Sequence, residues 1–178
     1  MIERTMIVST IKRSSVSLLA VVSLAAWPDL ALAQDLVTTR NVSLAMAAEA
    51  ATAAVEQCLQ DGFRATATVV DGAGHIKSVM RADGAGPHTI DSSRRKAYTS
   101  LSVGGSTGEL DTFLRERSPS SFGLRFVEQM LPLPGGLAIR AGDEVVGAIG
   151  VGGAPGGDKD ERCARAGIEK IQSRLKPR

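Results

Sequence analysis

Aromatic residues are scarce in this chain, and neither sign of charge predominates. Its 178 residues include one Trp, one Tyr and four Phe, and the formal net charge is +2 at pH 7 with the histidines neutral. Proteins that bind nucleic acid usually present a basic surface, and those that bind single strands also stack bases on aromatic rings. The composition therefore argues against a nucleic-acid partner and against attachment to an anionic membrane surface.

The common signatures of catalysis and metal binding are also missing. The chain has two cysteines and two histidines but no CxxC pair, so a thioredoxin-like redox site or a structural zinc site has little support. The segment Gly104–Gly108 has the spacing GxSxG, but it joins two predicted helices, whereas a nucleophile elbow joins a strand to a helix. No pair of carboxylates stands out as catalytic. An enzyme of unknown reaction, with His88 as its acid or base, stays open as one interpretation.

The one pronounced apolar run lies near the N-terminus. Two basic residues precede an apolar segment at 16–26, and the triplet Ala31-Leu32-Ala33 matches the small–x–small pattern of a cleavage site. A membrane span needs about 20 apolar residues, so the pattern predicts a signal peptide at 1–33, with an uncleaved anchor as the alternative. We therefore expect a mature domain at 34–178, periplasmic or secreted, without a membrane span.

The rest of the chain predicts helices and strands in alternating groups. The predicted elements are a helix at 42–60, strands at 63–70 and 75–81, helices at 90–102 and 107–117, strands at 137–140 and 144–151, and a helix at 158–175. Asn41 is expected to cap the first helix, whose apolar face starts at Leu44. In the second helix, Ile90, Arg94, Ala97 and Leu101 are expected to share one side. The order of elements is typical of an α+β fold with an antiparallel sheet.

The two cysteines fall on the first and the last of these helices. Cys58 lies on the apolar stripe of the first helix, and Cys163 lies in the first turns of the last. In an exported chain an even pair can form a disulfide, which is feasible if both helices cover the same face of the sheet. Two small buried thiols are the alternative.

A glycine-rich loop, 152–157, joins the last strand to the last helix. Glycines let backbone N–H groups point toward one place, and the helix start adds a positive dipole end, so the loop favours an anion such as a carboxylate. Too few residues follow for the βαβ unit of a dinucleotide site. The alternative is that the glycines only allow close packing beside the sheet.

A second group of candidate residues surrounds the start of the helix at 90–102. His88 follows a glycine–proline loop and has the chemistry of an axial haem ligand, or it is an exposed loop histidine. Arg94 and Tyr98 are i, i+4 neighbours, and Arg95 is expected on a different side. Arginine binds carboxylates through paired hydrogen bonds, while a solvated helix face is the alternative reading.

Five blocks, at 69–76, 80–85, 94–99, 135–139 and 142–158, occur in this order between Val42 and Ile171. Together they resemble the GlcG/HbpS family, whose members include haem-binding proteins. The resemblance implies a single α+β domain with an antiparallel sheet of two hairpins, helices packed mainly on one face, and assembly into homo-oligomers.

The resemblance also implies binding of haem or a related tetrapyrrole, with a role in handling haem or iron outside the cytoplasm. The residues expected to form the site are Pro87, His88, Arg94, Arg95, Tyr98, Gly152, Gly153 and Pro155. Among these, His88 is the candidate iron ligand. The alternative is a module that binds a small carboxylate metabolite without iron, through the same glycine loop and arginines.

Overall fold

The computed structural model describes residues 37–116 and 119–177, so the predicted signal peptide lies outside the described residues. The elements in chain order are α1 (Leu44–Gln60), β1 (Thr66–Asp71), β2 (Ile76–Arg81), α2 (His88–Val103), α3 (Thr107–Glu116), the 3₁₀ helix η1 (Pro119–Phe126), β3 (Gly136–Ala141), β4 (Glu144–Gly152), α4 (Gly157–Ile171) and the 3₁₀ helix η2 (Gln172–Arg174). Within the described ranges, no helix has the length and apolarity to cross a membrane.

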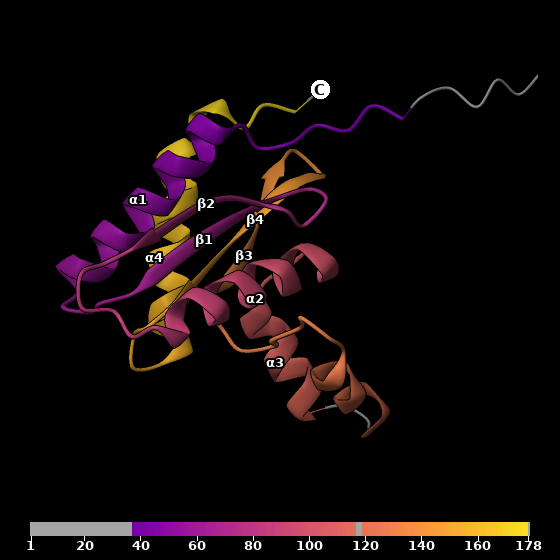
Figure 1. Cartoon of the computed structure of the whole chain (residues 1–178). Helices are drawn as coiled ribbons and strands as arrows, with labels where there is room; N and C mark the ends of the chain where they lie inside the picture. Colours follow the sequence, from indigo (N-terminus) through magenta and orange to yellow (C-terminus); the bar gives the residue numbers. More distant parts are fainter. Residues whose placement is uncertain (1–36, 117–118, 178) are drawn as a thin grey trace, which may run out of the picture. The chain divides into compact units, whose positions relative to one another are not determined.

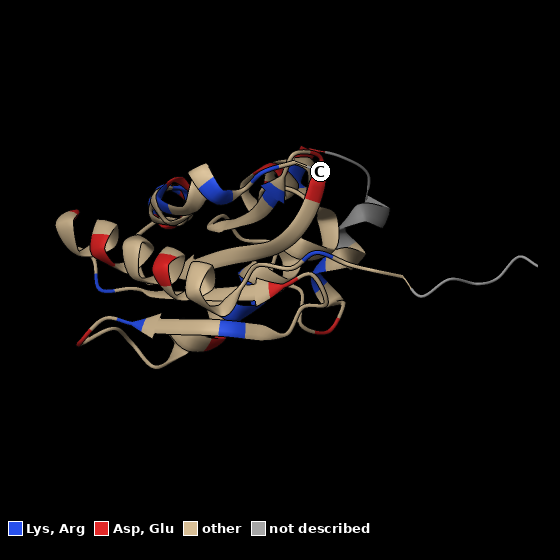
Figure 2. Cartoon of the chain, turned by 90° about the horizontal axis from the view of Figure 1, so that it is seen from above, with Lys and Arg blue, Asp and Glu red and all other residues tan. Residues whose placement is uncertain are grey.

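The four strands form one antiparallel sheet in the order β2-β1-β4-β3. The two hairpins, β1–β2 and β3–β4, join along β1 and β4, which confirms the predicted α+β fold. Basic and acidic positions are interspersed along the helices and strands (Figure 2).

Helices cover both faces of the sheet, and two of the three covering helices share one face (Figure 1). Side chains alternate along β1: Ala67 and Val69 pack into the main core with α1 and α4, whereas Val70 packs with Ala97 of α2. This period of two is the geometry of a strand with helices on both sides.

The backbone of α2 lies unusually close to β3 and β4. A Cβ added at Gly150 would lie closer than 3.0 Å to the Ser93 carbonyl oxygen, and one added at Gly136 would clash in the same way with Lys96. At this separation only short side chains fit between helix and sheet. Gly150 of β4 and Gly136 of β3 are therefore required by the packing of α2.

The buried face of α2 consequently differs from the predicted one. Ile90, expected on the same side as Ala97, is 44% exposed, while Ala97, Thr89 and Ser93 are buried. The hydroxyls of Thr89 and Ser93 form hydrogen bonds with those of Thr66 (2.7 Å) and Thr68 (2.8 Å) on β1. Two hydroxyls that form a hydrogen bond with each other can be buried inside the protein. A search for apolar residues at helical spacing therefore does not identify this buried face of α2.

Helix α1 begins two residues later than predicted. Ser43, rather than Asn41, caps it, because the Ser43 hydroxyl accepts a hydrogen bond from the Met46 N–H. The Asn41 side chain instead accepts one from the Gly72 N–H (2.8 Å). Leu44 is 64% exposed, so the buried face of the helix consists of alanines, Val55 and Cys58.

A disulfide joins α1 to α4. Cys58 and Cys163 are bonded to each other, with their Cα atoms 5.5 Å apart, and both side chains are fully buried. The two helices pack side by side on one face of the sheet. This shared face is what the sequence analysis required for a disulfide between the two cysteines.

Helix α3 and η1 are held together by a buried carboxylate. Asp111 accepts hydrogen bonds from Arg115 and Arg125, each at 2.8 Å. In the segment that follows, Met130 is buried, whereas Phe126 is 80% exposed.

Candidate functional site

The loop before α2 brings His88 to the surface. Pro87 occupies the N-cap position with φ −62°, a value that the proline ring sets in advance. The Thr89 hydroxyl donates to the Gly86 carbonyl (2.6 Å). A Cβ at Gly86 would lie 2.7 Å from Cε1 of His88, so the absence of a side chain there leaves room for the exposed imidazole.

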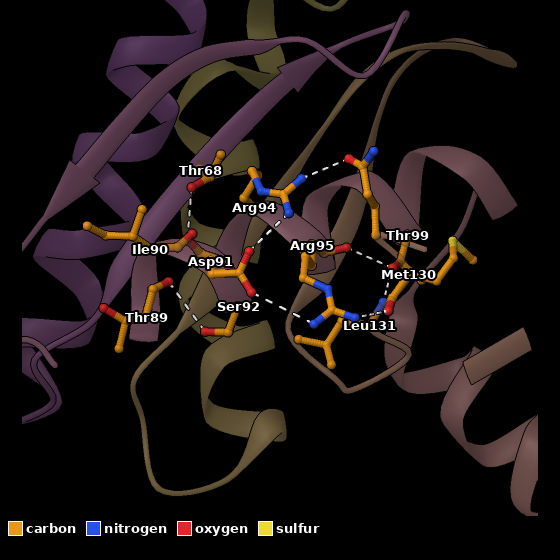
Figure 3. Close-up of polar contacts among 12 residues, drawn as sticks. Thr68, Thr89, Ile90, Asp91, Ser92, Arg94, Arg95, Thr99, Met130 and Leu131 are labelled. Atoms are coloured by element: carbon orange, nitrogen blue, oxygen red, sulfur yellow. Dashed lines mark hydrogen bonds and ion pairs between the residues drawn. The ribbon is translucent and has the colours of Figure 1, made fainter. Parts of the chain in front are cut away.

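Two arginines meet over one carboxylate on the outer side of α2 (Figure 3). An Arg94 nitrogen lies 3.0 Å from Asp91 Oδ1, and an Arg95 nitrogen lies 3.8 Å from Asp91 Oδ2. Adjacent helical positions point about 100° apart, which is why Arg95 was expected on a different side. The long side chains nevertheless converge, because Asp91 is three residues from one and four from the other.

The loop at 129–131 supports both arginines from the opposite side. Arg94 donates to the Gln129 side chain (2.9 Å), and Arg95 donates to the Met130 carbonyl (2.6 Å). The Leu131 N–H donates to the Thr99 hydroxyl (2.7 Å), which fixes the loop on α2 (Figure 3). The loop at 129–131 was not among the site residues predicted from the sequence. In the sequence, only Pro132 and Pro134, which follow it, mark this segment as irregular.

Both guanidinium groups keep some capacity for a further partner. The side chains of Arg94 and Arg95 are 29% and 31% exposed. Nε of Arg95 is buried and has no hydrogen-bond partner within the described part of the chain. Planar guanidinium groups recognise carboxylates by paired hydrogen bonds, so this place on α2 suits an incoming carboxylate.

The remaining helical candidate, Tyr98, lies against the turn of the first hairpin. A Cβ at Gly74 would lie 3.2 Å from the Tyr98 ring, and the side chain is half-buried. His88, Asp91 and Arg95 have the spacing i, i+3, i+7 and therefore share one stripe of the helix. Tyr98 flanks this stripe.

The glycine-rich loop borders the same helix. Gly152 is buried, and a Cβ there would clash with the Ser92 hydroxyl, so the loop starts beside the first turns of α2. Gly153 has φ +136°, a conformation that side-chain-bearing residues rarely adopt. Pro155 is exposed on the outer part of the loop.

Asp160 of α4 already accepts a hydrogen bond from a backbone N–H of this loop. Its Oδ1 accepts a hydrogen bond from the Ala154 N–H (2.9 Å), and its Oδ2 accepts one from Nζ of Lys96 (2.7 Å). Burial raises the pKa of the Asp160 carboxyl, and the charge and hydrogen bond of Lys96 act against that rise. An internal carboxylate thus lies where the sequence favoured an anion.

The predicted site residues form a surface along α2 rather than a closed cavity. Four pockets on the described part of the chain, at α4 and β3, at α3, between α3 and α4, and beside the start of α1, are lined by residues other than the candidates on α2 and its preceding loop. Within the described ranges, no cluster of three or more His, Cys, Asp or Glu side chains is placed to hold a metal ion.

Comparison with known proteins agrees with the fold. The family model described as haem degrading protein HbpS-like matches residues 42–169. A crystal structure of HbpS is 38% identical with a TM-score of 0.72, covering 76% of this chain and 94% of that one. A double mutant of Streptomyces reticuli HbpS is 39% identical with a TM-score of 0.72, covering 82% and 97%.

A more distant structure shows the same fold. The crystal structure of a PduOC–haem complex has a TM-score of 0.67 at 20% identity, covering 74% of this chain and 95% of that one. Among curated proteins none matches the chain. The family model spans most of the described domain, and the resemblance seen in the sequence is confirmed: the chain belongs to the HbpS-like family.

Proposed function

We propose that this protein is an exported haem-binding protein that handles haem or iron outside the cytoplasm. Membership of the HbpS-like family supports binding of haem or a related tetrapyrrole, and the predicted signal peptide supports export. The observation that carries the proposal is the meeting of Arg94 and Arg95 over Asp91, about two turns along α2 from His88.

The residues on this surface fit the groups that haem presents. Haem carries two carboxylates at one edge and an iron at its centre. The rise of 1.5 Å per helical residue separates His88 from Arg95 by about 10 Å along the axis. Arg94 and Arg95, whose side chains are 29% and 31% exposed, would hold the carboxylates. His88, exposed at the start of the same stripe, would hold the iron.

When bound, haem supplies an iron centre able to accept a nitrogen ligand. The protein's part is to orient it. Tyr98 flanks the stripe on one side, and Gly152, Gly153 and Pro155 are the proposed backbone contacts from the bordering loop, since Gly152 touches Ser92. Because α2 rests directly on the sheet, these groups are held on a rigid support.

A haemin titration of residues 34–178, followed by ultraviolet–visible absorbance, tests the proposal. We expect a saturable, sharpened Soret band at about one haem per chain or per pair of chains. His88→Ala should change the band, and the double variant Arg94→Ala/Arg95→Ala should weaken binding at least about tenfold through loss of two charge-assisted contacts. Arg162→Ala, which removes an arginine of α4 that is 59% exposed, is the control.

A broad shift that does not saturate would contradict haem binding. The alternative, a small carboxylate ligand held by Arg94 or Arg95 without iron, predicts a different result: no specific Soret band, but a rise in melting temperature with small organic acids that the double arginine variant abolishes.

A further inference from the structure

The loop at 129–131 contains a backbone conformation that side chains ordinarily avoid. Gln129 has φ +67°, and in residues 37–116 and 119–177 it is the one residue other than glycine with a positive φ. In this left-handed region the Cβ crowds the backbone. Residues held in such conformations are frequent at ligand-binding positions. Glycine would fit here without strain, so the long side chain of Gln129 needs an explanation of its own.

Contacts on both sides of Gln129 hold the loop in place. The Met130 N–H donates to the Val127 carbonyl (3.1 Å), which closes a four-residue turn with Gln129 at its third position. The Leu131 N–H donates to the Thr99 hydroxyl (2.7 Å). Glycine or asparagine is preferred where the third residue of a turn has a positive φ. These backbone contacts use no atom of the Gln129 side chain.

The Gln129 side chain instead contacts the arginine pair. Its Oε1 accepts a hydrogen bond from Nη1 of Arg94 (2.9 Å), while Nη2 of Arg94 donates to Oδ1 of Asp91 (3.0 Å). The guanidinium plane of Arg94 is therefore held between two acceptors. Each of these two nitrogens carries a second N–H group, so Arg94 can still donate to a third acceptor.

The same hydrogen bond determines which way the Gln129 amide faces. An amide nitrogen is a donor and cannot accept from an arginine, so the oxygen lies toward Arg94 and Nε2 lies on the other side of the amide carbon. Gln129 is an exposed residue, and its Nε2 carries two N–H groups that the bond to Arg94 does not use. The loop thus places a neutral donor beside two guanidinium groups.

We propose that Gln129 is a further carboxylate-binding residue of this site. Its Oε1 stays on Arg94, and its Nε2 donates to an oxygen of the bound carboxylate, which Arg94 and Arg95 contact with their remaining N–H groups. This role rests on the proposed function, because the carboxylates are those of haem. It also accounts for the left-handed backbone, since glycine at this position would supply neither the acceptor for Arg94 nor the donor for the ligand.

Haemin titrations of Gln129→Met test the contact. The full chain is expressed, and the purified product is titrated and followed by ultraviolet–visible absorbance. Methionine has nearly the length of glutamine but lacks the amide, so the dissociation constant should rise about tenfold, as for a lost hydrogen bond to a charged group. With haemin dimethyl ester, whose carboxylates are blocked, the variant and the parent should bind alike. Gln60→Met, an exposed glutamine at the end of α1, is the matched control.

A second comparison separates direct contact from positioning of Arg94. If Gln129 acts only by orienting Arg94, Gln129→Met has no effect once Arg94 is replaced by alanine. If its Nε2 contacts the ligand, the double variant Arg94→Ala/Gln129→Met should bind haemin more weakly than Arg94→Ala alone, by about threefold or more.

Melting temperatures separate a binding role from a role in folding. Gln129→Gly removes the side chain and relieves the left-handed strain, so its melting temperature should equal that of the parent or exceed it by a few degrees. Its haemin binding should nevertheless be weakened as in Gln129→Met. A melting temperature that falls in step with binding in both variants would show that Gln129 stabilises the loop instead.

Three further results would overturn the role of Gln129. These are haemin binding by Gln129→Met within about twofold of the parent, an equal loss with the dimethyl ester, and no added loss in the Arg94→Ala background. A parent chain that shows no saturable haemin binding would overturn the proposed function, and this contact with it. A parent that binds haemin while Gln129→Met binds equally well would overturn the contact alone, so the two failures are distinguishable.

Discussion

Nζ of Lys96 on α2 donates a 2.7 Å hydrogen bond to Oδ2 of Asp160 on α4, and both side chains are less than a tenth exposed. The same ammonium donates to the Val151 carbonyl at the end of β4 (3.0 Å). Asp160 in turn accepts from the Ala154 N–H in the glycine-rich loop. One buried ion pair therefore joins two helices, a strand and the loop that borders the proposed haem surface.

Breaking this pair should destabilise the fold strongly. Asp160→Asn keeps an acceptor for the Ala154 N–H but leaves the Lys96 charge buried without its counter-ion, at a cost of about 3–5 kcal/mol. Adding Lys96→Met removes that charge, so the double variant should be more stable than Asp160→Asn alone. Urea denaturation measures both. If the free energy of unfolding of Asp160→Asn lies within about 1 kcal/mol of that of the parent, the ion pair does not hold these elements together.

Stability at acid pH should depend on Asp111. Burial acts to raise the pKa of its carboxyl, but hydrogen bonds and charges of Arg125 and Arg115 outweigh burial and hold that pKa below the ordinary 3.8. The unfolded chain then binds the proton at higher pH than the folded one. The contribution of Asp111 is therefore present above about pH 3.8 and is lost as the pH falls through the folded pKa.

Urea midpoints between pH 3 and pH 6 check this sign. Asp111→Asn should be less stable than the parent at pH 6, and the difference should shrink toward pH 3. Asp160 gives the comparison, because its raised pKa means a contribution present at low pH and lost as the pH rises through its folded pKa. A gap between parent and Asp111→Asn that is constant with pH would contradict the assignment.

Removing Asp91 should strengthen haemin binding. Its carboxylate, 61% exposed, competes with an incoming carboxylate for Arg94 and Arg95 and repels it. Asp91→Asn should lower the dissociation constant for haemin several-fold, by about 1 kcal/mol. Asp143→Asn, in the turn between β3 and β4, removes an equal charge outside the proposed site and serves as the control. Unchanged or weaker haemin binding by Asp91→Asn would count against the arginine pair as the carboxylate contact.

A methyl group at Gly150 should separate α2 from the sheet. Its Cβ would clash with the Ser93 carbonyl oxygen and with the backbone of Ala97, neither of which can turn aside. We expect Gly150→Ala to cost about 1–3 kcal/mol or more and to weaken haemin binding, since α2 carries the proposed site. Gly123→Ala, with nothing within 4 Å of the added Cβ, should leave the melting temperature nearly unchanged.

The sequence by itself predicted the elements whose patterns are local. The hairpins followed from Thr- and Val-rich segments around glycine turns, and α4 followed from the spacing of Ala164, Ile168 and Ile171, of which the first and last are fully buried. The motif order indicated the family. Periodicity, turn chemistry and motif order are properties of neighbouring residues, so they can be read before the fold is known.

The tertiary structure decided everything that depends on which segments meet. It paired Cys58 with Cys163, placed hydroxyl-bearing residues rather than Ile90 under α2, and brought Gln129 and Met130 against the two arginines. It also turned Asp160 into the glycine loop's own carboxylate. Each of these contacts joins residues more than 20 positions apart or groups whose direction depends on packing. A local pattern carries no information about such distances, and so the composition of the site along α2 emerged only from the folded chain.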